Sequence, residues 1–253
     1  MKEYKCVSEE EKKFLENYDA SKYERPSLTT DIVIFTLDND DDLNILLIKR
    51  GAFPYKNKWA IPGGFLNVGT ESLEEAAVRE LKEETNVDNV FLNQLYTFSN
   101  PKRDPRTTVI SVAYTALVPK NKLDIKAGDD AAAAALFKIK YDVNGIIFLN
   151  GKVTISEEDL AFDHAEIIKM AITRLRNRID YEDDAFNLLK DKNEFTILEL
   201  KKIYETIKNK SLDLPNFRKA FLRDYVGSGR VVALDKKAVS KGKPAALFAL
   251  RKD

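Results

Sequence analysis

The stretch of sequence that decides the fold lies between positions 71 and 84 and reads Glu71-Ser72-Leu73-Glu74-Glu75-Ala76-Ala77-Val78-Arg79-Glu80-Leu81-Lys82-Glu83-Glu84. Ser72 and Glu75 have the spacing of a capping box, which predicts that a helix begins here. Three apolar residues recur every fourth position and predict one buried face: Leu73, Ala77 and Leu81. Asn86 tolerates the left-handed conformation in which helices commonly end. The pattern therefore predicts a helix from about Ser72 to Thr85.

Three glutamates of this helix, Glu80, Glu83 and Glu84, fall within one turn, about 100° around the helix from the buried face. Like charges this close repel, and each pair costs roughly 0.2–0.5 kcal/mol. A divalent cation reverses the sign of that energy, and oxygen ligands of this kind suit Mg²⁺ or Mn²⁺. Arg79, one turn before Glu83, can orient that carboxylate. The other interpretation is an acidic helix face exposed to solvent.

Strands and further helices are expected on both sides of this helix. Upstream, two apolar runs joined by the acidic turn at 38–42 predict a hairpin, and a loop then leads to the glycine pair at 63–64. We expect strands at 32–37, 43–48, 90–98, 108–117 and 136–140, helices at 8–18 and 164–179, and a linker at 180–184. The residues 143–155 give no clear pattern. Strands that alternate with helices indicate the α/β class.

Length and composition exclude several classes of protein. The 253 residues suit one large domain or two ordinary ones. No apolar run approaches the roughly 18 residues of a membrane span, and the first residues are too polar for a secretory signal. We therefore expect a cytoplasmic protein with no membrane partner. Cys6 and His164, each the single residue of its type, exclude a disulfide framework, a cysteine-based zinc finger and a multi-histidine metal site.

Charge is distributed unevenly, although the formal net charge is zero. From Lys190 to Asp253 there are 16 Lys and Arg against 8 Asp and Glu, a net charge of +8. The rest of the chain has 25 against 33, a net charge of −8. An acidic N-terminal block and a basic C-terminal block suggest two domains with different partners.

The glutamate helix and its flanks resemble the Nudix box, a glycine and glutamate followed by Arg-Glu-apolar-x-Glu-Glu. The matching residues are Gly64, Glu71, Arg79, Glu80, Leu81, Glu83, Glu84 and Val87. The resemblance covers about residues 28–160 and implies an α/β/α sandwich around a mixed sheet. Two positions depart from the box. Six residues instead of five separate Gly64 from Glu71, and Asn86 stands where the final glycine belongs.

The resemblance also implies roles for these residues. Glu80 and Glu84 would be the principal ligands of Mg²⁺ or Mn²⁺, and Glu83 a ligand or a base. The Gly64 carbonyl would join them, while Arg79 and Glu71 would pair to aim the carboxylates. The implied reaction is hydrolysis of a nucleoside diphosphate linked to another moiety, with metal neutralising the diphosphate and a carboxylate accepting a proton.

Other residues indicate which class of substrate the site would bind. Arg103 and Arg106 could clamp a phosphate, or form a surface turn held by a salt bridge. The segments 59–65, 103–106 and 127–131 resemble the ADP-ribose pyrophosphatase-like branch of Nudix proteins. The substrate-binding candidates are Arg50, Arg103, Arg106, Asp129 and Asp130. His164 is a candidate base, with a structural histidine at the start of a helix as the alternative.

The basic C-terminal block predicts helices at about 197–208 and 215–225, followed by two strands around a basic turn. Helix, helix and basic hairpin is the order of a winged helix. The residues expected to contact double-stranded DNA are Arg218, Lys219, Arg223, Lys241 and Lys243. The expected division is an N-terminal helical extension (1–27), a Nudix domain (28–160), a connecting helix and linker (161–184) and a winged helix (185–253). A basic accessory domain used for dimerisation is the alternative.

A Nudix domain followed by this tail resembles the Nudix-related transcriptional regulators of NAD metabolism. The motifs that carry this resemblance are Phe195-Thr196, Leu212-Asp213, Asn216-Phe217-Arg218-Lys219 and Gly242-Lys243-Pro244-Ala245. It implies either an active hydrolase that also regulates transcription, or a non-catalytic sensor of ADP-ribose or of a sugar. One winged helix makes few base contacts, so we expect a homodimer on a palindromic site.

Overall fold

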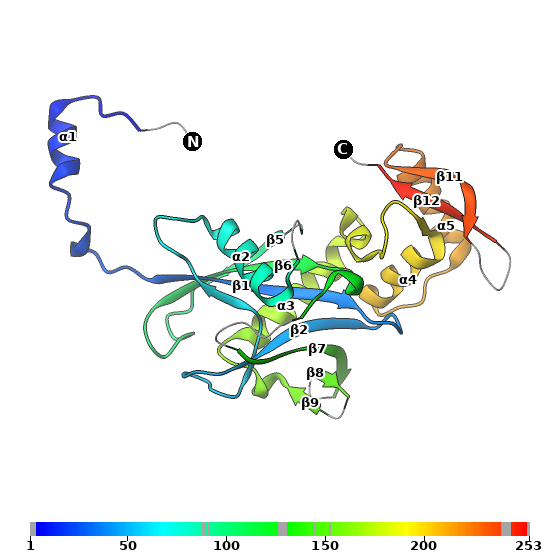
Figure 1. Ribbon diagram of the computed structural model, residues 1–253, viewed down its shortest axis with the longest axis horizontal. Helices are drawn as coiled ribbons and strands as arrows, with labels where there is room; N and C mark the ends of the chain where they lie inside the picture. Colours follow the sequence, from blue (N-terminus) through cyan, green and yellow to red (C-terminus); the bar gives the residue numbers. More distant parts are fainter. Residues whose placement is uncertain are drawn as a thin grey trace.

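The computed structural model describes residues 4–87, 90, 92–125, 131–143, 145–151, 153–238 and 244–251, without the side chains of 131 and 132. Figure 1 shows a large sheet with helices on both sides, and a smaller helical part with its own short sheet at the C-terminal end. In the described part of the chain, no helix is long and apolar enough to cross a membrane.

The large sheet is mixed, with β1 at its centre. β1 runs parallel to β6, from Ser27 opposite Val109 to Phe35 opposite Leu117. It runs antiparallel to β2, with Phe35 opposite Ile45. The strands in hydrogen-bonding order are β5 (Leu92–Phe98), β6 (Val109–Leu117), β1 (Ser27–Leu37), β2 (Leu43–Arg50), β7 (Ala131–Asp142), β8 (Gly145–Asn150) and β9 (Val153–Ser156), while β3 (Trp59–Ala60) pairs with β2 and β4 (Gly63–Phe65) with β1.

The two faces of β1 pack into two separate cores, as the period-two alternation of a strand requires. Ile32 and Ile34 belong to the core beneath α2 (Leu73–Thr85), together with Ala77 and Leu81 of that helix. Val33 and Phe35 belong to a second core, which contains one face of α3 (His164–Arg178). One helix therefore covers each face, and the expected α/β/α sandwich around a mixed sheet is confirmed.

The ends of α2 are formed as predicted. The Ser72 hydroxyl accepts from the Glu75 amide, and the Glu75 carboxylate accepts from the Ser72 amide. Asn86 ends the helix in the left-handed region at φ 52°. Asp163, the residue before α3, caps no amide of that helix with its side chain. Its carboxylate instead accepts two hydrogen bonds from Arg103.

Several strands exceed the prediction. β7 begins at Ala131, five residues before the expected start, because its alanines pair along β2 as far as Arg50. β8 and β9 occupy the segment that gave no pattern. The expected linker is also more ordered than predicted, since a 3₁₀ turn, η4 (Asp183–Leu188), continues from it with Ala185, Phe186 and Leu188 buried.

The C-terminal part has the elements of a winged helix. α4 (Ile197–Lys208) begins with a capping box between Thr196 and Glu199 and is followed by α5 (Leu214–Phe221) and one π-helical turn, η5 (Leu222–Val226). β10 (Phe195–Thr196), β12 (Ala245–Leu250) and β11 (Val231–Ala238) form a three-stranded sheet in that order. The apolar core beneath α3 continues into α4 and this sheet without interruption.

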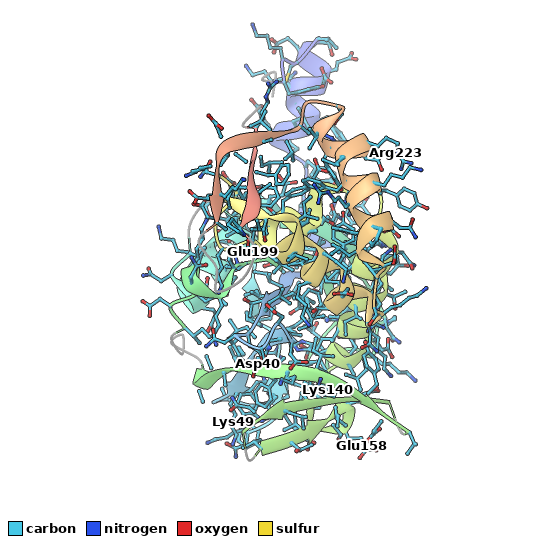
Figure 2. All side chains as sticks on the ribbon, turned by 90° about the vertical axis from the view of Figure 1, so that its right-hand side faces the viewer. Asp40, Lys49, Lys140, Glu158, Glu199 and Arg223 are labelled. Carbon is cyan, nitrogen blue, oxygen red and sulfur yellow. The ribbon has the colours of Figure 1, made fainter. Side chains whose placement is uncertain are left out.

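Polar contacts also join α4 to the large sheet. The Thr206 hydroxyl donates to the Asp41 carbonyl in the β1–β2 turn at 2.7 Å. The Arg176 Nε of α3 donates to the Ile207 carbonyl at 3.0 Å. Figure 2, viewed from the winged-helix side, shows Asp40 and Lys140 below the helices of the winged helix, and Arg223 at the outer edge of the molecule.

The N-terminal extension lies apart from both cores. Its helix α1 (Glu9–Glu16) is capped by Ser8 and buries none of its residues, and Figure 1 shows it projecting from the body. A short 3₁₀ turn, η1 (Ala20–Lys22), follows before β1. Two further 3₁₀ turns are η2 (Lys120–Lys122) and η3 (Glu157–Asp159).

Phe186 is expected to stabilise the two parts of the chain together. Its ring is 1% exposed and lies 5.7 Å from the Phe195 ring and 5.0 Å from the Tyr225 ring. Phe186→Ala should lower the free energy of unfolding by about 3–5 kcal/mol, because it leaves a cavity in this shared core. Tyr181→Ala, at an 86% exposed position nearby, should change it by less than about 0.5 kcal/mol. Urea denaturation measures both, and equal values would contradict the shared core.

Candidate functional site

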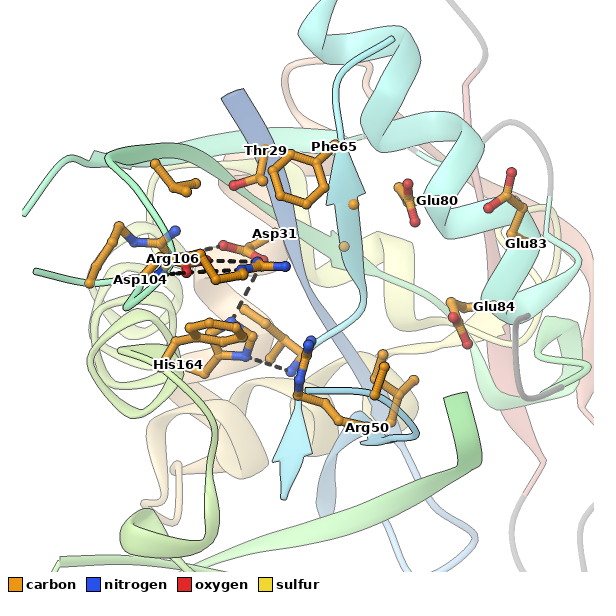
Figure 3. Close-up of a pocket in the computed structure, with 18 of the residues that line it drawn as sticks. Thr29, Asp31, Arg50, Phe65, Glu80, Glu83, Glu84, Asp104, Arg106 and His164 are labelled. Carbon is orange, nitrogen blue, oxygen red and sulfur yellow. Dashed lines mark hydrogen bonds and ion pairs between the residues drawn. The ribbon is translucent and has the colours of Figure 1, made fainter. Parts of the chain in front are cut away.

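A cavity of about 600 Å³ opens between α2, β4, β1, β2 and the start of α3. It contains most of the residues singled out in the sequence, although they are far apart along the chain. Figure 3 shows three glutamates of α2 on one side of β4, and Asp31, Asp104, Arg106 and His164 on the other. The residues used below that line the cavity are Thr29, Asp31, Arg50, Gly63, Gly64, Phe65, Arg79, Glu80, Glu83, Glu84, Arg103, Asp104, Arg106, Phe162 and His164.

Arg79 and Glu71 form the expected pair. The Arg79 guanidinium donates to Glu71 through NH2 at 2.9 Å and through Nε at 3.1 Å. It also donates to the Phe65 carbonyl at 3.2 Å and to Glu80 at 2.6 Å. Hydrogen bonds from Arg79 and from the Asn67 amide lower the pKa of Glu71 to about 2. This pair ties the start of α2 to β4 and to the loop between them.

Glu80 lies against Gly64. A Cβ atom on Gly64 would come within 1.9 Å of the Glu80 Oε1, so a larger residue there would displace this carboxylate. The extra loop residue therefore does not separate Gly64 from the glutamates. The loop takes it up in a turn in which Asn67 accepts from the Thr70 amide and Gly69 has φ +83°. Burial raises the pKa of the Glu80 carboxyl, although Arg79 opposes that shift.

Glu83 and Glu84 differ in exposure. The Glu83 side chain is 54% exposed and lies 3.6 Å from Arg79, while Glu84 is 7% exposed. Both line the cavity beside Glu80, as Figure 3 shows. Within the described ranges, however, no three acidic, histidine or cysteine side chains converge as a metal-ion site. The three glutamates thus line one cavity without converging on a single point, and Arg79 neutralises part of their charge.

Arg106 is held at the opposite side of the cavity by Asp104. Its guanidinium donates to that carboxylate through Nε at 3.0 Å and NH2 at 2.8 Å, and it lies 5.5 Å from the centre of the Phe65 ring. Asp104 is 6% exposed, whereas the Arg106 side chain is 44% exposed. Arg50 lies across the cavity, with Nε bonded to the Pro54 carbonyl at 2.9 Å.

Arg103 differs from the expectation of an open phosphate clamp. Its side chain is 4% exposed, and it donates to Asp163 at 2.7 and 2.9 Å and to Asp31 at 3.2 Å. The alternative of a surface salt bridge does not describe Arg103, because all three groups are buried or nearly so, but it does describe the partly exposed pair of Arg106 with Asp104. A buried guanidinium needs such partners, and here it ties the β5–β6 loop to β1 and α3.

Asp31 is the site residue that the sequence interpretation missed. It lies in β1 beside Ile32 and is 7% exposed. Its Oδ2 accepts from Arg103 and from the Ser111 hydroxyl. One feature of the sequence could have identified Asp31: it is an acidic residue at the start of an otherwise apolar strand. Acidic side chains are rarely buried without partners, so such a residue indicates a polar site.

His164 is buried at the first residue of α3. Its Nδ1 accepts the Ile61 amide at 3.0 Å, so the proton of the neutral ring is on Nε2, which lies 3.7 Å from Asp31 Oδ1. Burial lowers the pKa of His164, although Asp31 and Asp163 oppose that shift. The structural interpretation of this histidine is supported, and it also faces the cavity.

The remaining candidates divide between two regions. Asp129 and Asp130 lie outside the described residues, as do Lys241 and Lys243 at the expected tip of the wing. Arg218 and Lys219 are exposed on α5. Arg223 follows on η5 and forms two hydrogen bonds to Asp224, at 2.6 and 2.7 Å. Its charge is therefore partly neutralised within the chain.

Known proteins share this arrangement of domains. A family model described as the NUDIX domain matches residues 28–140, and one described as the NrtR DNA-binding winged helix domain matches residues 185–250. The ADPR responsive transcriptional repressor NtrR of Acinetobacter baylyi is 34% identical over 242 residues, covering 94% of this chain and 87% of the relative. The chain belongs to the NrtR family of Nudix proteins. This confirms the resemblance inferred from the sequence.

Further relatives match one or both parts of this NrtR-family chain. The ADP-ribose pyrophosphatase of Methanocaldococcus jannaschii is 40% identical over 161 residues, covering 62% of this chain and 82% of the enzyme. A MutT/nudix family protein from Enterococcus faecalis superposes with a TM-score of 0.74 and 31% identity, covering 98% and 100% of the two chains. Shewanella oneidensis NrtR, crystallised with a 27mer DNA, gives 0.64 and 28% identity, covering 88% and 93%.

The single histidine predicts a defined dependence of stability on pH. Because burial lowers its folded pKa, the unfolded chain binds a proton below about pH 6.5 that the folded chain does not bind. Stability from this group should therefore be complete above pH 6.5 and fall at lower pH, by at most about 1.4 kcal/mol per pH unit. His164→Asn, which keeps an acceptor for the Ile61 amide, should lack this fall.

Chemical denaturation of both proteins between pH 5 and 8 measures the effect as their difference. The raised carboxyl pKa values of Glu80 and Asp184 are common to both proteins and cancel. Parallel pH profiles for the two proteins would show that His164 is not held neutral by the fold.

Proposed function

We propose that this chain binds ADP-ribose or a related nucleoside diphosphate in the cavity, hydrolyses it with Mg²⁺ or Mn²⁺, and regulates transcription through its winged helix. The observation that carries the proposal is the cavity itself, which joins the three glutamates of α2 and the held guanidinium of Arg106 in one space. The pyrophosphatase and the ADPR responsive repressor among its relatives support this ligand class.

The residues on α2 suit a divalent cation by the chemistry of their donor atoms, although the three carboxylates do not converge on one point in the described part of the chain. Their carboxylates are hard oxygen donors of the kind that Mg²⁺ and Mn²⁺ prefer. Gly64 lets the backbone lie close to Glu80, whose carboxylate any side chain at position 64 would displace. Glu80, Glu84 and the Gly64 carbonyl would hold the ion, with Glu83 as a further ligand or as the base. When bound, such an ion neutralises diphosphate charge and activates water.

The side chains themselves have separable roles in this proposal. Arg79 and Glu71 fix the rotation of Glu80 and the position of the loop. Arg106, oriented by Asp104, presents its remaining N–H groups to a phosphate, as a guanidinium does well. Glu83, the most exposed of the three glutamates, is open to solvent and is the group best placed to accept a proton from water.

A non-catalytic sensor is the second candidate function. Arg79 bridges Glu80 at 2.6 Å and Glu83 at 3.6 Å, so the cavity keeps its shape and charge balance without turnover. The relative that aligns with 94% of the chain is a repressor. Under this alternative, ADP-ribose or a sugar binds in the cavity and only changes affinity for DNA.

DNA binding is assigned to α5 and the wing. Arg218 and Lys219 are exposed there, and no ion pair is recorded for either side chain among the described residues. We propose a homodimer that places two winged helices on a palindromic site. A cytoplasmic location follows from this role.

One experiment separates the two candidates. The purified protein is incubated with Mg²⁺ and a panel of nucleoside diphosphate compounds, and phosphate release is read after coupling to a phosphatase. Turnover of ADP-ribose supports the hydrolase. Tight binding of ADP-ribose without turnover, measured by calorimetry, supports the sensor, and neither binding nor turnover would overturn the proposed ligand class.

Replacing one buried glutamate should abolish metal binding while the protein stays folded. Glu84→Gln should abolish Mn²⁺ binding and any turnover, because it removes the charge of a ligand that is only 7% exposed. Glu74→Gln, at an exposed position of the same helix, should leave both unchanged. Calorimetric titration with Mn²⁺ measures binding, and equal affinity in the Glu84→Gln protein would place the metal elsewhere.

The winged helix should bind duplex DNA in a strongly salt-dependent way. Arg218→Ala with Lys219→Ala should reduce the slope of log affinity against log salt by roughly 1.8, about 0.9 for each lost phosphate contact. Arg223→Ala should have a smaller effect, since Asp224 already pairs with that guanidinium.

ADP-ribose should change the affinity for DNA, and DNA should change the affinity for ADP-ribose by the same factor. Gel shifts on genomic fragments test this, and no binding at about 50 mM salt would leave the tail an accessory domain.

A further inference from the structure

We propose that Asp31 and His164 form a recognition site for a sugar hydroxyl on the side of the cavity opposite the glutamates. This inference rests on the proposed function and deepens it, because it names the residues that distinguish a sugar-bearing diphosphate from a simple one. Both residues line the cavity, and Figure 3 shows them across β4 from Glu80, Glu83 and Glu84.

The two carboxylate oxygens of Asp31 have different surroundings. Oδ2 accepts from the Ser111 hydroxyl and from Arg103. Oδ1 faces His164, whose Nε2 lies 3.7 Å away, beyond hydrogen-bond range. Asp31 lines the cavity, so a ligand hydroxyl that donates to Oδ1 would take the place of water there.

The backbone leaves this oxygen open on the cavity side. Gly63 of β4 lies beside it, and a Cβ atom there would come within 2.8 Å of Oδ1. The same atom would come within 2.2 Å of the Thr30 carbonyl, so the strand pairing itself requires glycine at this position. The absence of a side chain at position 63 therefore keeps Oδ1 uncovered.

His164 supplies the complementary group. Its Nδ1 is occupied by the Ile61 amide, which fixes the proton on Nε2 and points it toward the same space. A donor and an acceptor 3.7 Å apart that do not satisfy each other match a group that can both accept and donate. A hydroxyl has this property, and two adjacent hydroxyls of a sugar can take one partner each.

Other ligand groups fit less well. A phosphate would lie against the negative charge of Asp31. A cation would add a positive charge beside Arg103, which already pairs with Asp31 and Asp163. An amino group of a base donates but accepts nothing from the Nε2 proton of His164. The chemistry therefore favours a neutral polyol, which in ADP-ribose is either of its two riboses.

The test combines changes in the protein with changes in the ligand. Wild type, Asp31→Asn and Ser111→Ala are titrated by calorimetry with ADP-ribose, ADP and ADP-ribose analogues that each lack one ribose hydroxyl, in EDTA and again in Ca²⁺. In Asp31→Asn the amide oxygen keeps the bonds from Arg103 and Ser111. The amide nitrogen then replaces Oδ1, which turns the acceptor into a donor. Ser111→Ala removes a partner of Oδ2 only.

We expect one analogue to bind wild type roughly ten- to a hundredfold more weakly than ADP-ribose, the effect of one hydrogen bond to a charged group. Asp31→Asn should bind ADP-ribose more weakly by a similar factor and should no longer distinguish that analogue. Ser111→Ala should still distinguish it. The analogue affected shows which ribose is bound. Equal losses for every ligand in Asp31→Asn, or no discrimination by wild type, would overturn the proposal.

A second measurement decides the matter if Asp31→Asn does not fold. His164 is the only histidine, so its imidazole NMR signals are unambiguous in wild type. ADP-ribose should shift them, and the affected analogue should not; identical shifts from both would overturn the site. UDP-glucose and ribose 5-phosphate are included for the case in which no adenosine diphosphate compound binds. If wild type then binds UDP-glucose or ribose 5-phosphate more tightly than Asp31→Asn does, the sugar site is supported although the proposed ligand is wrong. If no ligand binds, both proposals are overturned.

Discussion

The rest of the structure depends on β1 being buried on both faces while it is hydrogen-bonded on both edges. Its alternate residues must fill two cores, one beneath α2 and one beneath α3. Such a strand reads as a continuous apolar run, and every position from Thr30 to Leu37 is buried. The one charged residue in that run, Asp31, is tolerated because Arg103 and Ser111 hold its carboxylate. The strand that organises the sheet thus also places a fixed acceptor at the floor of the cavity.

Two guanidinium groups give the cavity its shape, and they work in different surroundings. Arg79 is partly exposed and bridges two glutamates and a carbonyl of β4, so it positions the glutamate side. Arg103 is buried between Asp31 and Asp163, so it fixes the side opposite. Removing one partner from a buried pair leaves an uncompensated charge and costs more than a surface pair contributes. The side of the cavity around the buried Arg103 is therefore held more firmly than the side formed by the glutamates of α2.

Local patterns predicted the parts of this molecule that local chemistry determines. The capping box of Ser72 and the left-handed exit at Asn86 depend only on neighbouring residues, and both are present. The Arg79–Glu71 pair came from a specific motif. Arg103 was misread because the distinction between a phosphate clamp and a buried ion pair depends on Asp31 and Asp163, 72 and 60 positions away. β7 was predicted too short because alanine has little strand preference by itself and pairs there only because β2 lies alongside.

The same elements that line the cavity also reach the winged helix. β1 and β2 carry Asp31 and Arg50 at one end, and at the other their turn accepts a hydrogen bond from Thr206 of α4. α3 begins with His164 at the cavity, and its last turn carries Arg176, bonded to the Ile207 carbonyl of α4. A ligand alters DNA affinity only to the extent that it binds two arrangements unequally. These two hydrogen bonds join the strands and the helix that line the cavity directly to α4, so two arrangements of the cavity would differ in their contacts with the winged helix through such junctions.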